Sequence, residues 1–189
     1  AQCLVGSEMC IRDSFHTMDQ ILHKMMKDSD NLYAESMYYQ IASSTGNRPA
    51  SAKSARNVQR QLVRKIGLDP ARYKFADGSG LSLYNYVSAE LEVKLLRYAY
   101  QDENILPHLK QSLPIAGVDG TLKRRMRSGF AHGNVKAKTG TVTGVIGLAG
   151  YCKAANGHDL CFSILNNGIM HSNNARSFAD KVCELLCEP

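Results

Sequence analysis

Two short motifs in this sequence combine residue types that suit acyl transfer. Ser29-Asp30-Asn31 offers a hydroxyl and a carboxamide, and Lys138-Thr139-Gly140 offers a cation, a hydroxyl and an open stretch of backbone. Acyl transfer from an amide needs a hydroxyl that passes a proton to the leaving amine, a role that fits Ser29. The Asn31 amide could then hold a backbone carbonyl of the substrate.

The second motif suits a substrate that ends in a carboxylate. Lys138 supplies the cation for such a group and Thr139 a hydroxyl donor. Gly140 lets a substrate backbone approach the chain closely, because no side chain stands in the way. The backbone N–H of Thr141 could point at a developing oxyanion.

Structural explanations of the same residues compete with these roles. Ser29 could simply cap the helix that follows it, as serine often does. Lys138 and Thr139 could form an ordinary exposed strand pair. Since tripeptides recur by chance, the two motifs alone leave this simpler interpretation open.

The periodicity of apolar residues predicts which elements position the motifs. Helical spacing with start and stop signals predicts helices at about 17–27, 31–46, 51–66, 89–100 and 106–112, and a last helix that Ser172 or Asn173 caps. From residue 134 the pattern changes to three strands, at 134–143, 145–154 and 158–166, with short turns between them. We therefore predict an α+β fold with helices packed on an antiparallel sheet. The first motif then lies between two helices, and the second lies on the first strand.

Two finer predictions concern the C-terminal half. In the last helix, Phe178, Val182, Leu185 and Leu186 form the expected apolar face. The hairpin signal Asn156-Gly157 predicts a two-residue turn that would place Cys152 opposite Cys161. A cross-strand disulfide is then sterically possible, although two small buried thiols are the favoured interpretation.

Composition excludes several other classes of function. The 189 residues carry a formal net charge of +6, partly from the cluster Lys123, Arg124, Arg125 and Arg127, which we interpret as a solvated surface. No nucleic-acid-binding motif surrounds that cluster, so we expect no nucleic-acid partner. No Cys/His set has zinc spacing, which predicts no metal site. No apolar run approaches the roughly 20 residues that a membrane span requires.

Longer blocks of the sequence resemble one family. The two motifs belong to a set that class A β-lactamases and penicillin-binding proteins share, together with an S-x-x-K motif. The chain from Phe15 onward is similar to the D-alanyl-D-alanine carboxypeptidase/endopeptidases, the class C low-molecular-mass penicillin-binding proteins. The similar segments lie at 27–35, 77–88, 113–122, 135–141 and 148–151, and include Phe162 to Ile164 with Asn166.

The resemblance implies a fold, a reaction and a location. Residues 15–189 would be the C-terminal part of a penicillin-binding catalytic domain of the transpeptidase and β-lactamase type. Ser29, Asn31 and Lys138 would be catalytic, and Thr139, Gly140 and Thr141 would bind substrate. The substrate would be a peptidoglycan stem peptide ending in D-Ala-D-Ala, and β-lactams would inhibit. No metal or organic cofactor is implied, and the expected location is the periplasm or cell envelope after export.

One part of the family pattern is missing from these residues. No lysine in the sequence has a serine or threonine three positions before it, so the S-x-x-K nucleophile is absent. Residues 1–14 resemble a translated sequencing adapter, which suggests that the natural protein continues upstream. We therefore expect the 189 residues alone to release no D-alanine from substrate.

Two alternatives from the sequence remain. A class A β-lactamase would share both motifs, but such enzymes need a glutamate in a loop between the motifs, and residues 41–77 contain none. A non-catalytic peptidoglycan-binding relative that has lost its nucleophile would also fit these residues.

Overall fold

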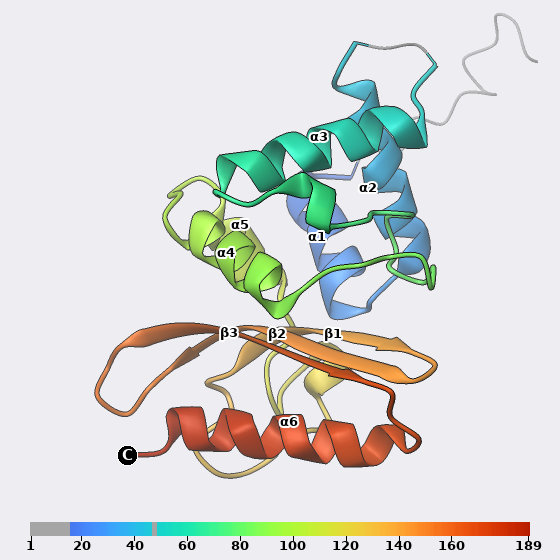
Figure 1. The fold of residues 1–189 in the computed structure, drawn as a ribbon. Coiled ribbons are helices and arrows are strands. Elements are labelled where there is room, and N and C mark those ends of the chain that lie inside the picture. Colours follow the sequence, from blue (N-terminus) through green and yellow to red (C-terminus); the bar gives the residue numbers. More distant parts are fainter. Residues whose placement is uncertain (1–15, 47–48) are drawn as a thin grey trace, which may run out of the picture.

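The computed structural model describes residues 16–46 and 49–189 (Figure 1). Its helices are α1 (Met18–Lys27), α2 (Asn31–Ser43), α3 (Ala52–Lys65), α4 (Ala89–Tyr100), α5 (Leu106–Ser112) and α6 (Ser172–Cys187), with short 3₁₀ turns η2 (Pro70–Arg72) and η3 (Gly120–Leu122). Its strands are β1 (Lys136–Val142), β2 (Val145–Lys153) and β3 (Asp159–Asn167). Residues 1–14, which resemble a translated sequencing adapter, lie outside the described residues.

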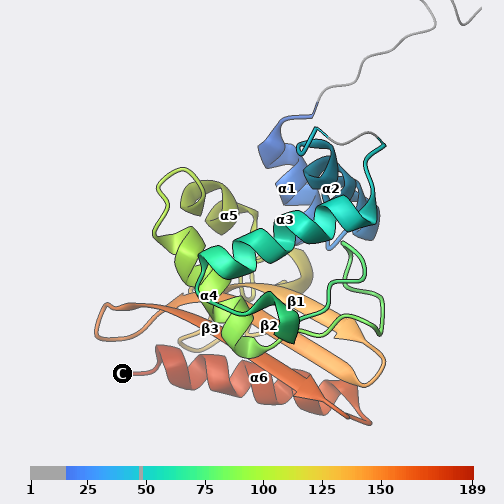
Figure 2. The same cartoon turned by 45° about the horizontal axis from the view of Figure 1, so that its top comes forward.

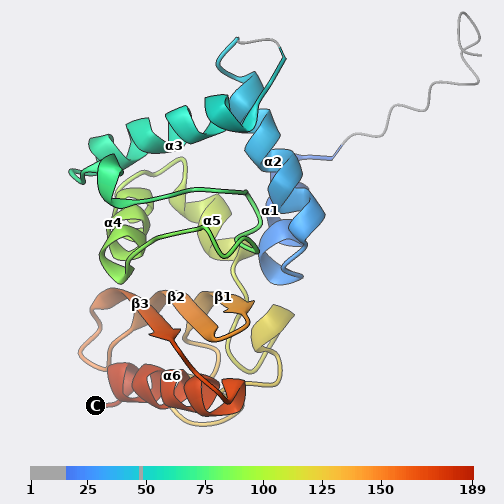
Figure 3. The same cartoon turned by 45° about the vertical axis from the view of Figure 1, so that its right-hand side comes forward.

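Three antiparallel strands in the order β1-β2-β3 separate two helical layers. Helix α6 runs along one face of the sheet, and α4 packs on the other face with the remaining helices beyond it (Figures 1 and 3). Seen from above, α3 runs from beside α2 toward α4, with which it shares a small core that contains Val63 and Leu91 (Figure 2). This arrangement confirms the predicted α+β fold with helices on an antiparallel sheet.

The main core lies between the sheet and α6. Leu148 and Phe162 of the strands pack against the small residues Ala179 and Cys183 of α6. The predicted apolar face of α6 was wrong for Phe178 and Leu185, which are 54% and 69% exposed, whereas Leu186 packs against the core as predicted. The buried positions repeat every four residues at Ala175, Ala179, Cys183 and Cys187. Small side chains there let the helix lie close to the sheet, which larger ones would prevent.

The β2–β3 hairpin has a different register from the predicted one. Ala154 and His158 bracket a three-residue loop, with the Ala154 N–H donating to the His158 carbonyl at 2.9 Å and Gly157 at φ +85°. Cys152 therefore lies opposite Leu160, while Cys161 lies opposite Tyr151. Since successive side chains of a strand alternate between faces, the two thiols point to opposite sides of the sheet. The cross-strand disulfide is excluded, and both cysteines are free.

Local start signals set most helix ends. Thr17 and Gln20 form a capping box at the start of α1, and Ser88 caps α4. The predicted cap of α6 was wrong: His171 occupies the N-cap position and makes no side-chain capping bond. None of the helices in the described part of the chain is long and apolar enough to cross a bilayer.

Candidate active site

A cleft of about 810 Å³ opens where the N-terminus of α2, the loop at residues 79–81, strand β1 and the start of α6 meet. All six residues that the sequence singled out line it, although they come from two segments 109 residues apart: Ser29, Asn31, Lys138, Thr139, Gly140 and Thr141. The fold therefore brings the two motifs together around one solvent-accessible space.

Ser29 occupies a strained turn between α1 and α2. Its φ is +57°, in the left-handed region that non-glycine residues rarely adopt. The residue that caps α2 is Asp30, whose carboxylate accepts the N–H groups of Leu32 and Tyr33 at 3.0 and 3.1 Å. The interpretation of Ser29 as the cap of α2 was therefore wrong, because Asp30 caps this helix. The Ser29 hydroxyl faces the cleft instead, and strain of this kind is often found at functional sites.

Lys138 connects the two motifs directly. Its ammonium donates to Ser29 Oγ at 2.7 Å and to the Thr139 carbonyl at 2.9 Å. Burial lowers the pKa of Lys138 below its usual range. A lysine with a lowered pKa exchanges a proton with a neighbouring hydroxyl more readily than an exposed one does. The pair therefore has the hydrogen-bond geometry that a proton relay through Ser29 would require.

The outer edge of β1 presents backbone groups to the cleft. The Ala137 N–H points away from β2 and donates to the Pro114 carbonyl at 3.0 Å. Because these directions alternate along an antiparallel strand, the N–H groups of Thr139 and Thr141 also point away from β2. Thr139 Oγ1 donates to Thr121 Oγ1 at 2.9 Å. Hydroxyl and backbone donors therefore lie together at this edge.

A partly buried ion pair holds the Ser29 turn against the loop that follows α5. Lys27, the last residue of α1, pairs with Asp119, and their side chains are 9% and 34% exposed. Asp119 also accepts the Ile115 N–H at 2.8 Å. Figure 3 shows the short helix η3, which follows Asp119, lying beside β1. Sequence reasoning missed this pair, although both residues lie in the blocks that carried the resemblance.

The opposite wall of the cleft is a loop held by two carboxylates. Glu35 accepts the N–H groups of Gly78 and Ser79 at 3.2 and 2.9 Å, and the Ser79 hydroxyl at 2.7 Å. Asp77 accepts the Gly80 N–H at 2.9 Å. A side chain at position 78 would meet Tyr38 Cβ at 2.5 Å, so only glycine permits this close packing on α2. Since Asn31 and Glu35 share that helix, α2 positions two walls of the cleft at once.

The sequence analysis also missed the ion pair at the α6 side of the cleft. Arg125 donates to Asp180 through Nη2 at 2.6 Å and through Nε at 3.0 Å. Both residues line the cleft and are half-buried. One member of the basic cluster at 123–127 is therefore a structural ion-pair partner, whereas Lys123, Arg124 and Arg127 are exposed as expected.

The geometry suits binding and proton transfer by side chains and backbone. Among residues 16–46 and 49–189, no three side chains of the His, Cys, Asp and Glu types are grouped so that they could hold a metal ion. The cleft instead gathers cationic and hydroxyl side chains, with Lys138, Ser29 and Thr139 among them, around the open edge of β1.

Comparison with known sequences agrees with this geometry. The sequence profile of the D-Ala-D-Ala carboxypeptidase 3 (S13) family matches residues 8–187. The D-alanyl-D-alanine carboxypeptidase DacB of Haemophilus influenzae is 38% identical over 153 residues, which cover 80% of this chain and 32% of that protein. The D-alanyl-D-alanine carboxypeptidase of an Actinomadura species is 39% identical over 163 residues, covering 84% of this chain and 29% of that protein. The chain thus spans about a third of the length of these relatives.

Solved structures show the same fold. Penicillin-binding protein 4 of Haemophilus influenzae, in complex with a β-lactam, superimposes with a TM-score of 0.79 at 34% identity, over 88% of this chain and 40% of that one. The TLA-3 extended-spectrum β-lactamase superimposes with a TM-score of 0.62 at 15% identity, over 91% of this chain and 62% of that one. The second likeness is one of fold alone.

Proposed function

Because the chain belongs to the D-Ala-D-Ala carboxypeptidase 3 (S13) family, we propose that it forms the substrate-recognition and proton-relay part of a serine-type D-Ala-D-Ala carboxypeptidase. The observation that carries this proposal is the 2.7 Å hydrogen bond from Lys138 to Ser29, which joins the two motifs in one cleft. Family membership favours this activity over that of a class A β-lactamase.

Each residue in the cleft has a role that its position supports. The Ser29 hydroxyl gives its proton to the leaving D-alanine amine, and the Lys138 ammonium replaces that proton. Lys138 and Thr139 attract the terminal carboxylate of the substrate, and Asn31 holds a backbone carbonyl. The open edge of β1 pairs with the substrate backbone, and the Thr141 N–H faces the oxyanion of the tetrahedral intermediate.

The complete enzyme needs a nucleophile that these residues do not contain. We propose that a serine of an S-x-x-K segment, elsewhere in the natural protein, forms the acyl-enzyme and is the residue that β-lactams acylate. The substrate is the D-Ala-D-Ala end, or a D-Ala cross-link, of a peptidoglycan stem peptide. The enzyme acts at the cell envelope after export, where that polymer lies.

Binding of a substrate fragment tests the proposal without the nucleophile. We expect N-acetyl-D-Ala-D-Ala to shift amide NMR signals of residues 29–31 and 138–141 in the ¹⁵N-labelled chain. The same dipeptide with a C-terminal amide should bind about tenfold more weakly, because it lacks the charge that Lys138 attracts. Equal affinity for both ligands would contradict carboxylate recognition in this cleft.

The variant Gly140→Ala tests whether glycine at position 140 is needed for substrate binding or for folding. A Cβ built at Gly140 meets nothing closer than the Gly147 backbone at 4.0 Å, so the fold tolerates it. We expect the unfolding free energy to change by no more than about 0.5 kcal/mol. Dipeptide affinity should fall about tenfold, because the methyl group occupies space that the substrate backbone needs. Unchanged affinity in a folded variant would remove Gly140 from the binding site.

The pH dependence of binding should report on Lys138. Only the protonated amine attracts a carboxylate, and burial lowers its pKa. Affinity for N-acetyl-D-Ala-D-Ala should therefore be greatest at lower pH and fall as pH rises through that lowered pKa, earlier than for an exposed lysine. Titrations at a series of alkaline pH values measure this loss, and Lys138→Arg should move it to higher pH because arginine stays protonated. Coincident profiles for the two proteins would contradict the assignment.

A further inference from the structure

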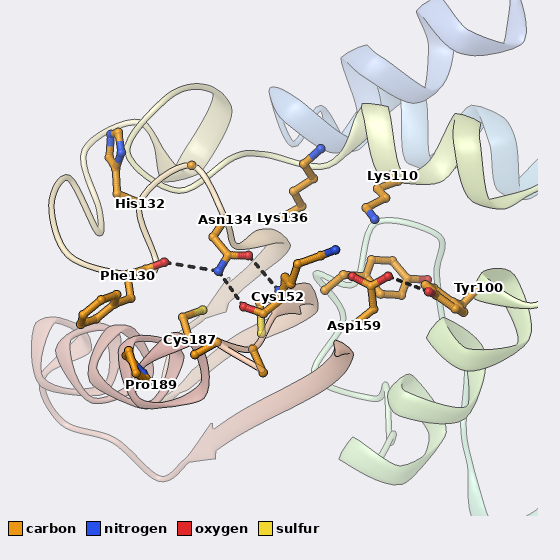
Figure 4. Close-up of a pocket in the computed structure, with 15 residues that line it drawn as sticks. Tyr100, Lys110, Phe130, His132, Asn134, Lys136, Cys152, Asp159, Cys187 and Pro189 are labelled. Carbon is orange, nitrogen blue, oxygen red and sulfur yellow. Dashed lines mark hydrogen bonds between the residues drawn. The ribbon is translucent and has the colours of Figure 1, made fainter. Parts of the chain in front are cut away.

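A second pocket, of about 700 Å³, lies at the end of the sheet where β1 begins and β2 ends. It shares no residue with the cleft that contains Ser29 and Lys138. Figure 4 shows its walls, to which α5, the loop before β1 and the end of α6 contribute. None of the proposed catalytic steps uses this pocket.

The charged side chains of the pocket are mostly cationic. Lys110, Lys136 and Lys153 line it, against Asp159 as its one acidic side chain. Lys110 and Lys136 are half-buried, yet none of the three ammonium groups has a hydrogen bond or ion pair within the described part of the chain. Half-buried cations lose hydration and normally gain a partner in return. An unpaired set of this kind favours an anion from outside the chain.

The one acidic side chain is already engaged. Tyr100 donates its hydroxyl to Asp159 at 2.7 Å. That bond, with the nearby charges of Lys110 and Lys153, holds the pKa of Asp159 below its usual range. In Figure 4 Lys110 extends from α5 toward Asp159, but the two do not form an ion pair. In the 189-residue chain, the three ammonium groups of the pocket therefore still outnumber its two anionic groups, Asp159 and the terminal carboxylate of Pro189.

Hydrogen bonds tie together the two strand ends that form one side of the pocket. Asn134 bridges the loop before β1 and the end of β2: its amide donates to the Lys153 carbonyl at 2.8 Å, and its Oδ1 accepts the Lys153 N–H at 2.8 Å. Lys136 sits where β1 also bridges to Ile115. These backbone contacts fix the two strand ends from which Lys136 and Lys153 extend.

We propose that this pocket binds a compact anion with two or more negative charges, of the phosphate type, held by Lys110, Lys136 and Lys153. Such a group could belong to a free phosphate compound or to a phosphate-containing polymer, since both present the same charged oxygens. The proposal is independent of the activity of the cleft, because the two sites share no residue.

Titration of the ¹⁵N-labelled 189-residue chain with inorganic pyrophosphate at low ionic strength tests this site. Saturable signal changes are expected around residues 110, 134–136 and 151–154. The double variant Lys110→Gln/Lys136→Gln should bind about tenfold more weakly, because it removes both half-buried cations. Lys123→Gln/Arg124→Gln makes the same change in net charge at exposed positions and is the matched control. It should lower affinity by no more than about twofold.

Equal weakening by the two double variants would overturn the proposal, since it would show general attraction to a basic protein. Signal changes spread over the whole surface, or no saturation, would overturn it equally. The variant Lys110→Arg/Lys136→Arg keeps the charges and should retain binding, which guards against misfolding of the glutamine variant. A glycerol phosphate oligomer distinguishes a phosphate-containing polymer from a free phosphate compound as the natural ligand. If the oligomer binds more tightly than pyrophosphate, the ligand is a polymer. If it binds more weakly, the ligand is a free anion.

Discussion

Replacing Lys27 with methionine is expected to lower the unfolding free energy of the chain by about 3 kcal/mol. Lys27 is 9% exposed in its ion pair with Asp119, and methionine of similar length leaves that carboxylate without its counter-charge. The same change releases the Ser29 turn from the loop that carries Thr121. Thermal unfolding should show a loss of roughly 6–12 °C in Tm.

Lys24→Met is the matched control, because Lys24 lies one turn earlier in α1. It pairs with Asp28, but both side chains are about half exposed, at 47% and 50%. Solvent screens that pair, so its loss should lower stability far less than the loss of Lys27 does. Removing both charges of the Lys27–Asp119 pair, in Lys27→Met/Asp119→Asn, should recover part of the stability. Similar losses for Lys24→Met and Lys27→Met would contradict a special role for the buried pair.

Gly150→Ala is expected to destabilise the sheet by about 3 kcal/mol. A Cβ at Gly150 would lie 2.1 Å from the Lys136 carbonyl oxygen and 2.5 Å from Ala137 Cα, both of which belong to the backbone of β1. No rotation of a side chain relieves these contacts, so β1 must move away from β2. Since Lys138 follows Ala137, the variant should also lose affinity for N-acetyl-D-Ala-D-Ala.

Gly147→Ala provides the comparison on the same strand. Its Cβ would meet the flexible end of Leu165 at 3.3 Å and the Gly140 backbone only at 4.0 Å. Its stability should stay within about 1 kcal/mol of the parent in chemical denaturation. If the two alanine variants unfold at the same denaturant concentration, close packing of β1 on β2 is not what requires glycine at position 150.

Much of the architecture was predictable because its signals are local. Caps such as Thr17 and Ser88, apolar periodicity and turn residues act within a few positions, so the helices and strands were found near their observed bounds. The two motifs were recognisable for the same reason. The errors arose where distant packing decides. In α6 the apolar side chains Phe178 and Leu185 suggested one face, but the sheet selected the face with small residues.

The hairpin shows how little a local signal can settle. Asn156-Gly157 correctly marked the turn, but a loop longer by one residue moved Cys152 and Cys161 to opposite faces of the sheet. Successive side chains of a strand point to opposite faces of the sheet, so an error of one residue in register assigns every side chain of the strand to the wrong face.

By itself, the sequence determined the elements, the two motifs and the family, because each depends on residue types at short spacing. Only the tertiary structure decided that Lys138 contacts Ser29 and that the ion pair of Lys27 with Asp119 holds the Ser29 turn. The same holds for the cationic pocket of Lys110, Lys136 and Lys153, which three separate segments assemble. Such contacts join residues far apart in the chain, and they form only when helices and strands pack to exclude water.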